Sequence, residues 1–214
     1  MNNLHILGNK NSLFNEFIAE VRNVEVQTDS MRFRRNLERI GEIFAYEISK
    51  VMKYSEQEVV TPLGIANIPR LQEKPVLATI LRAGLPLHQG FLNFFDHADN
   101  AFISAFRKYY KDGTFEIQID YLSSPDLDDK TLILCDPMLA TGGSACDAID
   151  LLKKRGCKHI KFMAIIGAPE GVSRVAEAHP DVKIYVSTLD RCLNDKGYIL
   201  PGLGDAGDRL FGTK

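Results

Sequence analysis

The most informative residues of the chain are Leu132-Ile133-Leu134-Cys135-Asp136-Pro137-Met138-Leu139-Ala140-Thr141-Gly142-Gly143-Ser144. The first four form an apolar run that is typical of a buried strand. After Ser144 the apolar residues recur with the helical period at Ala145, Ala148, Ile149 and Leu152, which predicts a helix from Ala145 to Arg155. The stretch therefore predicts a strand and a helix, joined by an acidic residue and a turn of small residues.

The turn of small residues before this helix is suited to bind a phosphate. In Thr141-Gly142-Gly143-Ser144 the backbone N–H groups converge without Cβ atoms in the way, beside the positive end of the helix dipole. Asp136 ends the strand, where ligands bind in open α/β sheets, and its carboxylate is suited to accept hydrogen bonds from ribose hydroxyls. The 136–144 loop thus predicts a site for a phosphorylated sugar.

The loop differs from two other nucleotide-binding motifs. It contains neither G-x-x-x-x-G-K-[ST] nor G-x-G-x-x-G, which argues against a nucleoside-triphosphate P-loop and a dinucleotide fold. A plain strand-to-helix turn, capped by Ser or Thr, stays open as the alternative.

The bulk properties point to an ordinary globular protein. The 214 residues are 45% hydrophobic and 25% charged, with a net charge of −2, which predicts one domain without global attraction for nucleic acid or anionic membrane. No run approaches the roughly 18 apolar residues of a membrane span, and no secretory signal begins the sequence. The cysteines and histidines form no metal-ligand pattern. We expect a cytoplasmic protein with no nucleic-acid partner, no membrane partner and no protein-held metal site.

Two features are expected before residue 75. A long amphipathic helix is predicted from its buried stripe, with its Arg and Glu residues solvated and its cap at Thr28, Asp29 or Ser30; the stripe is Phe33, Leu37, Ile40, Phe44, Ile48 and Val51. Residues 58–68 then predict two short strands around a turn, an arm suited to contact between two copies of the chain.

From residue 75 strands alternate with helices. The expected strands are Val76–Leu81, Ala101–Phe106, Phe115–Leu122, 131–135, Ile160–Ile166 and Val182–Ser187. Helices are expected up to about Phe95, over 145–155 and near Glu170–Ala178, and a polar loop at Arg107–Gly113. This alternation predicts an α/β fold with a mostly parallel twisted sheet and flanking helices. Within one domain (1–214), we expect the helix and arm at about 12–70, the α/β core at about 75–190 and a tail at about 191–214.

The tail breaks the alternation because Gly197–Arg209 is too rich in Gly and Asp for a packed element. Pro201 and its apolar neighbours argue against a disordered segment. Backbone donors and acceptors at fixed spacing suit a small planar heterocycle in a mostly apolar slot. An ordinary structured C-terminal turn stays open as the alternative.

The 136–144 loop together with Gly197–Thr213 resembles the uracil phosphoribosyltransferases, a family of type I phosphoribosyltransferases. Ile80–Leu85, Ala168–Val172 and Phe44–Glu47 resemble the same family, and the likeness covers about residues 28–214. The resemblance implies a type I phosphoribosyltransferase fold with a small β arm and a base-binding hood formed by the tail.

The resemblance also implies a reaction, in which uracil and 5-phosphoribosyl pyrophosphate (PRPP) give uridine monophosphate (UMP) and pyrophosphate in pyrimidine salvage. Asp136, Arg82 and Asp205 would carry catalysis, Arg82 and Arg107 would contact pyrophosphate, and Mg²⁺ would be held mainly through PRPP. The ribose 5-phosphate would lie on Asp136, Pro137, Met138, Leu139, Ala140, Thr141, Gly142, Gly143 and Ser144, and uracil on Ile199, Gly204, Asp205 and Ala206. A homodimer or higher homo-oligomer is implied as well.

Two segments depart from the family pattern. Lys108–Gly113 is more basic and aromatic than its counterparts, and Leu85–Gln89 departs from the usual small and apolar residues. Three alternative functions stand beside the family reaction: a regulatory protein that senses PRPP or a pyrimidine nucleotide, a transferase for a different base, and a binding domain without catalysis. The absence of a Lys/Arg stripe argues against RNA binding by the first. The tail argues against the second, and the presence of Asp136, Arg82 and Asp205 against the third.

Overall fold

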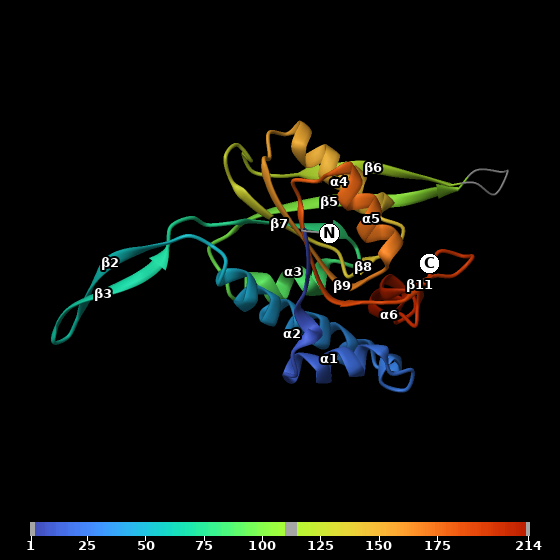
Figure 1. The fold of residues 1–214 in the computed structure, drawn as a ribbon, viewed down its shortest axis with the longest axis horizontal. Helices are drawn as coiled ribbons and strands as arrows, with labels where there is room; N and C mark the ends of the chain where they lie inside the picture. Colours follow the sequence, from blue (N-terminus) through green and yellow to red (C-terminus); the bar gives the residue numbers. More distant parts are fainter. Residues whose placement is uncertain (1–2, 110–114, 213–214) are drawn as a thin grey trace.

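The computed structural model describes residues 3–109 and 115–212 and is built on an eight-stranded sheet (Figure 1). The strands follow the order β1-β10-β9-β7-β4-β5-β6, and β8 also pairs with β9. Neighbours are parallel except β5 and β6. Their bounds are β1 Leu4–Ile6, β4 Val76–Leu81, β5 Asp99–Tyr109, β6 Phe115–Ser123, β7 Thr131–Cys135, β8 Met138–Leu139, β9 His159–Gly167 and β10 Lys183–Leu189. The predicted mostly parallel α/β sheet is confirmed.

Helices cover both faces of the sheet. Figure 1 shows α4 and α5 on one side and α1, α2 and α3 on the other, and the two hydrophobic cores divide in the same way. The bounds are α1 Leu13–Arg22, α2 Ser30–Ser49, α3 Leu85–Leu92, α4 Gly143–Lys154, α5 Pro169–Ala178 and α6 Ala206–Phe211, with short 3-10 turns at Leu7–Asn9 and Val26–Thr28. Since β4 and β7 are apolar and almost wholly buried, they form the centre of a sheet that is covered on both faces. No helix of these described segments has both the length and the apolar character that crossing a membrane requires.

The long predicted helix is α2. Asp29 caps it, its side chain accepting a hydrogen bond from the Arg32 backbone N–H at 3.0 Å. The predicted stripe from Phe33 to Ile48 is buried, whereas Val51 follows the end of the helix and is 60% exposed.

The sequence did not lead us to expect two elements that precede α2. β1 adds an edge strand beside β10, and α1 packs against α2. The signal for α1 was present, because Ser12 and Asn15 form a capping box and the buried residues Phe14, Ile18 and Val21 follow the helical period.

The predicted loop at Arg107–Gly113 is wrong in its first part. Arg107, Lys108 and Tyr109 belong to β5, where they pair with β6 in the register Arg107↔Ile117. The antiparallel partner strand provides hydrogen bonds for an extended backbone that the polar composition did not reveal. Residues 110–113 of the predicted loop lie outside the described residues.

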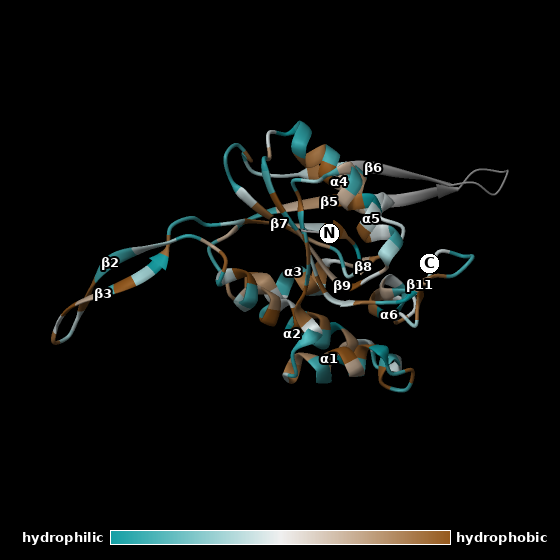
Figure 2. Cartoon of the chain, viewed as in Figure 1, coloured by the Kyte–Doolittle hydropathy of each residue, from teal (hydrophilic) through white to brown (hydrophobic). Residues whose placement is uncertain are grey.

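The predicted arm is a longer hairpin than expected. β2 (Tyr54–Thr61) and β3 (Gly64–Leu71) pair from Tyr54↔Leu71 to Thr61↔Gly64 and project away from the sheet (Figure 1). Figure 2 shows hydrophobic residues near its tip, where Val60, Leu63 and Ile65 are 84%, 100% and 67% exposed. An exposed apolar patch of this kind is typical of a contact surface.

The order of the strands places the ligand site. In the sheet, β5 lies on one side of β4, and the next parallel strand along the chain, β7, lies on the other side of β4. In open α/β sheets, ligands bind at such a switch point, beyond the carboxyl ends of the strands. Arg82 directly follows β4 and Asp136 directly follows β7. The two predicted residues therefore lie at the same edge of the sheet, at its switch point.

The core between α1, α2 and α3 leads to a first prediction. Phe44 is fully buried between two other rings, 5.4 Å from the centroid of Phe14 and 6.3 Å from that of Phe91. Phe44→Ala should lower the free energy of unfolding by about 3–5 kcal/mol, because it removes apolar contacts and leaves a cavity. Urea unfolding measures this loss. Phe94→Ala, at a ring that is 55% exposed, is the matched control and should stay within about 0.5 kcal/mol of the wild type; equal losses in both variants would contradict the packing described.

Candidate active site

A pocket of about 160 Å³ joins the 136–144 loop to the tail. From the predicted residues it brings together Asp136, Met138, Ala140, Ile199, Gly204, Asp205 and Ala206. Ala83, Lys196, Gly197, Tyr198 and Gly207 also line it and were not predicted as site residues. Segments from the middle and the end of the chain thus form one concave surface at the switch point.

The part of the loop that was predicted to bind phosphate lies at the start of α4. Gly142 is the N-cap residue, with φ at +77°, and no side chain caps the helix. Thr141 Oγ1 lies 3.5 Å from the Gly143 N, too far for a strong hydrogen bond. The contact of Thr141 is thus at most a weak one, and the Ser or Thr cap of the plain-turn alternative is not formed at the N-cap. The first N–H groups of a helix have no intrahelical acceptors, so they are available to an anion.

Close packing requires glycine at Gly142. A Cβ atom there would lie 2.9 Å from the Gly171 carbonyl oxygen, in a backbone conformation that residues with side chains rarely adopt. The 136–144 loop is also pinned to β9 and α5, since the Ile165 and Ile166 N–H groups donate to the Pro137 oxygen and the Ala168 N–H to the Leu139 oxygen. The loop is thereby preorganised before a ligand binds.

Asp136 has unusual electrostatics. Burial raises its pKa from the ordinary value of 3.8 to about 7, against the opposing effect of the hydrogen bond from the Met138 backbone. Among the described residues it forms no ion pair. A ligand whose hydroxyl groups donate to this carboxyl favours its ionised form, so Asp136 is suited to bind a sugar.

The tail is held by a hydrogen-bonded ion pair outside the pocket. The Arg22 guanidinium, at the end of α1, donates to both carboxylate oxygens of Asp190 at 2.6 and 2.9 Å and to the Gly202 carbonyl at 3.0 Å. Asp190 in turn accepts from the Gly202 N–H at 2.9 Å. Burial acts to raise the pKa of Asp190, but the hydrogen bonds from Arg22 and Gly202 hold it below its ordinary value.

Two more side chains hold the tail backbone. Gln27, 4% exposed, donates from Nε2 to the Leu203 carbonyl at 2.9 Å. Arg34, on α2, donates to the Leu210 carbonyl at 2.6 Å, so its expected place on a solvated face is wrong. With these contacts the tail forms a small hairpin, β11 (Cys192–Leu193) and β12 (Ile199–Leu200), and then α6. The prediction that it is not a packed element is wrong in this respect, because side chains from the N-terminal helices satisfy its backbone groups.

The two predicted arginines stand apart from the pocket lining. Arg82 is exposed, and its guanidinium carbon lies 5.7 Å from the ring centroid of Phe211. Its neighbour Ala83 lines the pocket. Arg107 lies in β5, and its side chain is outside what the structure describes.

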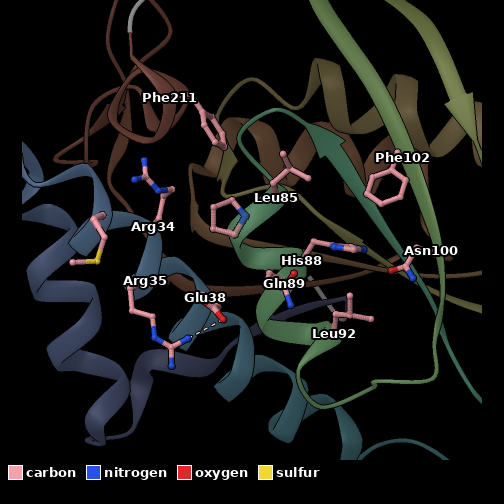
Figure 3. A pocket seen from close by; sticks show the side chains of 12 residues that line it. Arg34, Arg35, Glu38, Leu85, His88, Gln89, Leu92, Asn100, Phe102 and Phe211 are labelled. Carbon is pink, nitrogen blue, oxygen red and sulfur yellow. Dashed lines mark ion pairs between the residues drawn. The ribbon is translucent and has the colours of Figure 1, made fainter.

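A second hollow, of about 690 Å³, lies between α2, α3 and β5 (Figure 3). Leu85, Leu92 and Phe102 give it apolar walls, and the ion pair of Arg35 and Glu38, at 2.8 Å, lies on one side. It is larger than the pocket beside Asp136, but none of the predicted site residues lines it. We therefore take the smaller pocket as the candidate active site.

Within residues 3–109 and 115–212, no group of three His, Cys, Asp or Glu side chains is arranged to hold a metal ion. Two carboxyl groups nevertheless line the pocket, those of Asp136 and Asp205. The Asp205 Oδ1 accepts from the Asp208 N–H at 3.1 Å. A Mg²⁺ ion that arrives with a ligand and keeps part of its water shell needs only one or two carboxylates from the protein.

Comparisons with known proteins agree with this geometry. A family model described as uracil phosphoribosyltransferase matches residues 9–213. A uracil phosphoribosyltransferase from Porphyromonas gingivalis is 50% identical over 210 residues, 97% of this chain and 97% of that protein. The solved structure of an Aquifex aeolicus protein has a TM-score of 0.86 at 34% identity, covering 99% of both chains. Adenine phosphoribosyltransferase from Trypanosoma brucei shares the fold, with a TM-score of 0.59 at 14% identity over 92% of this chain and 88% of that one.

The ion pair that holds the tail leads to a second prediction. Asp190→Ala should lower the free energy of unfolding by about 3 kcal/mol, because it leaves the Arg22 charge partly buried without its partner. The folded pKa lies below the unfolded value, so this contribution is present above about pH 3.8 and is lost as the pH falls through the folded pKa. Urea unfolding at pH 7 measures the loss in free energy of unfolding. A titration with UMP should show weaker binding, because the tail that this ion pair holds lines the pocket.

The matched control for this experiment is Asp181→Ala. Asp181 pairs with Lys153 at 2.7 Å, but its side chain is 52% exposed, so the loss should stay below about 1 kcal/mol. If Asp190→Ala behaved like this control and kept full UMP affinity, the Arg22–Asp190 pair would not be what holds the tail.

Proposed function

The chain belongs to the uracil phosphoribosyltransferase family, and from that premise we propose that its reaction takes place in the pocket between the 136–144 loop and the tail. The family reaction transfers the 5-phosphoribosyl group from PRPP to N1 of uracil, giving UMP and pyrophosphate. The chain is therefore a pentosyltransferase. The observation that carries the choice of pocket is that the Asp136 carboxyl group, Met138 and Ala140 of the loop that leads to the start of α4, and the backbone-rich tail line one cavity.

The sugar end of the substrate belongs on the 136–144 loop in this proposal. The 5-phosphate accepts hydrogen bonds from the uncapped N–H groups at the start of α4, near Thr141 to Ser144. The ribose hydroxyls donate to Asp136, whose carboxyl group lines the same pocket. Pro137, Met138, Leu139 and Ala140 connect these two contacts.

Uracil belongs on the tail. Ile199, Gly204, Asp205 and Ala206 line the pocket, and the backbone of this segment offers donors and acceptors to the two carbonyls and N3–H of the base. Because Arg22, Gln27 and Asp190 fix that backbone, the slot holds its shape and discriminates between bases by hydrogen bonding.

The reaction requires little covalent chemistry from the protein. A bond forms between uracil N1 and C1 of the ribose as the bond from C1 to the pyrophosphate oxygen breaks, and N1 gives up its proton. Holding the two substrates in line contributes up to about 7–11 kcal/mol in favourable cases. The carboxylate of Asp136 faces the developing positive charge on the sugar, and Arg82 and Arg107 stabilise the negative charge of the leaving pyrophosphate.

Mg²⁺ is part of the proposal as the ion that accompanies PRPP. It neutralises negative charge on the pyrophosphate when bound. Asp136 and Asp205 are the carboxylates that line the pocket and fit such an ion.

We propose a homodimer or a higher homo-oligomer, with the β2–β3 arm as a contact between copies. The support is the exposed apolar surface at its tip, Val60, Leu63 and Ile65. A place in the cytoplasm, in nucleotide salvage, is supported by four cysteines that are all free thiols. The net charge of −2 supports small-molecule substrates without a nucleic-acid partner.

UMP formation from labelled uracil, PRPP and Mg²⁺ tests the proposed site. The wild type should turn over uracil, and Asp136→Asn should lower kcat by about 10²-fold or more because it removes a charge beside the developing cation. Since burial disfavours ionised Asp136, the variant should remain at least as stable as the wild type at pH 8. Cytosine should be used up to about 10⁴-fold less well, because it leaves buried partners unpaired. Near-normal turnover by Asp136→Asn would remove this residue from the site, and comparable use of cytosine would remove the tail from base recognition.

The raised pKa of Asp136 predicts proton release on PRPP binding. The folded group, with its pKa near 7, is largely protonated at pH 6, and hydrogen bonds from the ribose hydroxyls favour its ionised form. Calorimetry at pH 6.5 in two buffers of different ionisation enthalpy counts the protons released. The wild type should release more protons than Asp136→Asn, in which the phosphate groups of PRPP contribute alone. Equal proton release by both proteins would show that Asp136 does not ionise when PRPP binds.

A further inference from the structure

Arg82 has an exposed side chain that lies beside an aromatic ring. It forms no ion pair with any of the residues that the structure describes, and its guanidinium carbon lies 5.7 Å from the ring centroid of Phe211. That distance is within the range of a cation–π contact. Because a long exposed side chain samples many rotamers, contact with this ring restricts the orientation of the guanidinium before a substrate binds.

The backbone next to Phe211 is anchored to the core and to α2. Leu210, the residue before it, is fully buried in the core, and its carbonyl accepts the 2.6 Å hydrogen bond from Arg34 of α2. Gly212 then ends α6 with a φ of +81°. Figure 3 shows Phe211 and Arg34 at the same end of the large hollow, opposite Asn100 and Phe102. The backbone at Phe211 is therefore fixed through Leu210, and the ring, which is 41% exposed, lies beside Arg82.

The same short helix reaches the base pocket at its other end. Asp205 caps α6, and both Asp205 and Ala206 line the pocket assigned to uracil. Six residues later along the chain the ring of Phe211 meets Arg82, which follows β4 at the switch point. One short helix thus connects the pocket assigned to the base with the arginine assigned to pyrophosphate.

We infer that Phe211 is a positioning residue for this reaction: its ring orients Arg82 toward the pyrophosphate of PRPP, and α6 sets the place of that ring relative to the uracil pocket. The inference rests on the proposed role of Arg82 in binding pyrophosphate. It assigns Phe211 a function through Arg82 and no contact with either substrate.

Calorimetric titration with PRPP and Mg²⁺ tests the inference on the full chain. Phe211→Leu should weaken PRPP binding by about two- to fivefold, the size of an exposed cation–π contact. Phe211→Tyr keeps a ring face and should bind PRPP like the wild type. Arg82→Ala should weaken binding by about tenfold or more, as expected for the loss of charge-assisted hydrogen bonds. In the Arg82→Ala background, Phe211→Leu should have no further effect.

UMP supplies the control ligand, because it has the base and the 5-phosphate but no pyrophosphate. All the variants should bind UMP within twofold of the wild type, and thermal unfolding should confirm that each is folded. If Phe211→Leu weakened UMP as much as PRPP, or kept its effect without Arg82, the ring would only support the tail and the inference would be overturned. If Arg82→Ala weakened PRPP binding but Phe211→Leu did not, the inference alone would fail. Unchanged PRPP affinity in Arg82→Ala would overturn the proposed role of Arg82 and the inference with it.

Discussion

The candidate site depends on the ion pair between Arg22 and Asp190, although neither residue lines the candidate pocket. Arg22 ends α1 and Asp190 follows β10, and between them they donate to the Gly202 carbonyl and accept from its N–H. A segment as rich in glycine as the tail has a large conformational entropy to lose on ordering. Hydrogen bonds from the partly buried Arg22 and the buried Gln27 offset that cost, because they pair backbone carbonyls of the tail that would otherwise have no partner. The surface proposed to bind the base is therefore held in place by the N-terminal helices as much as by the tail itself.

The sugar end of the site follows a different principle. There the sheet provides the geometry: β4 and β7 end side by side at the switch point, and Arg82, Asp136 and the start of α4 lie beyond their carboxyl ends. The helix start favours negative charge, whereas burial makes a negative charge on Asp136 unfavourable until a ligand donates hydrogen bonds to it. The two properties suit a ligand that carries phosphate and hydroxyl groups together. Phe211 connects this end to the tail through its contact with Arg82.

The sequence predicts local features of this protein well, and long-range contacts poorly. The parallel sheet, the buried stripe of α2 and the glycine turn at Gly142 follow from periodicity and from residue type, and the structure confirms them. Membership of the family follows from the long motifs at 136–144 and 197–213. Arg34 was expected on a solvated face, and Arg22, Gln27 and Asp190 were not singled out. Arg22 and Asp190 pair with each other across the chain, and all four residues contact backbone groups of the tail that are distant in sequence or belong to a segment that was not expected to be a packed element. Nor does the polar run after Phe106 reveal that β6 pairs with it and extends β5 to Tyr109.

The central claim is that a single pocket, built from the 136–144 loop and the tail, holds the sugar and the base together. A crystal structure of the protein with UMP tests it most directly. We predict the 5-phosphate at the backbone N–H groups between Thr141 and Ser144, the ribose hydroxyls at Asp136, and the uracil ring against the backbone of Ile199 and Gly204–Ala206. UMP bound in the larger hollow between α2, α3 and β5, or bound with its base away from the tail, would contradict the claim.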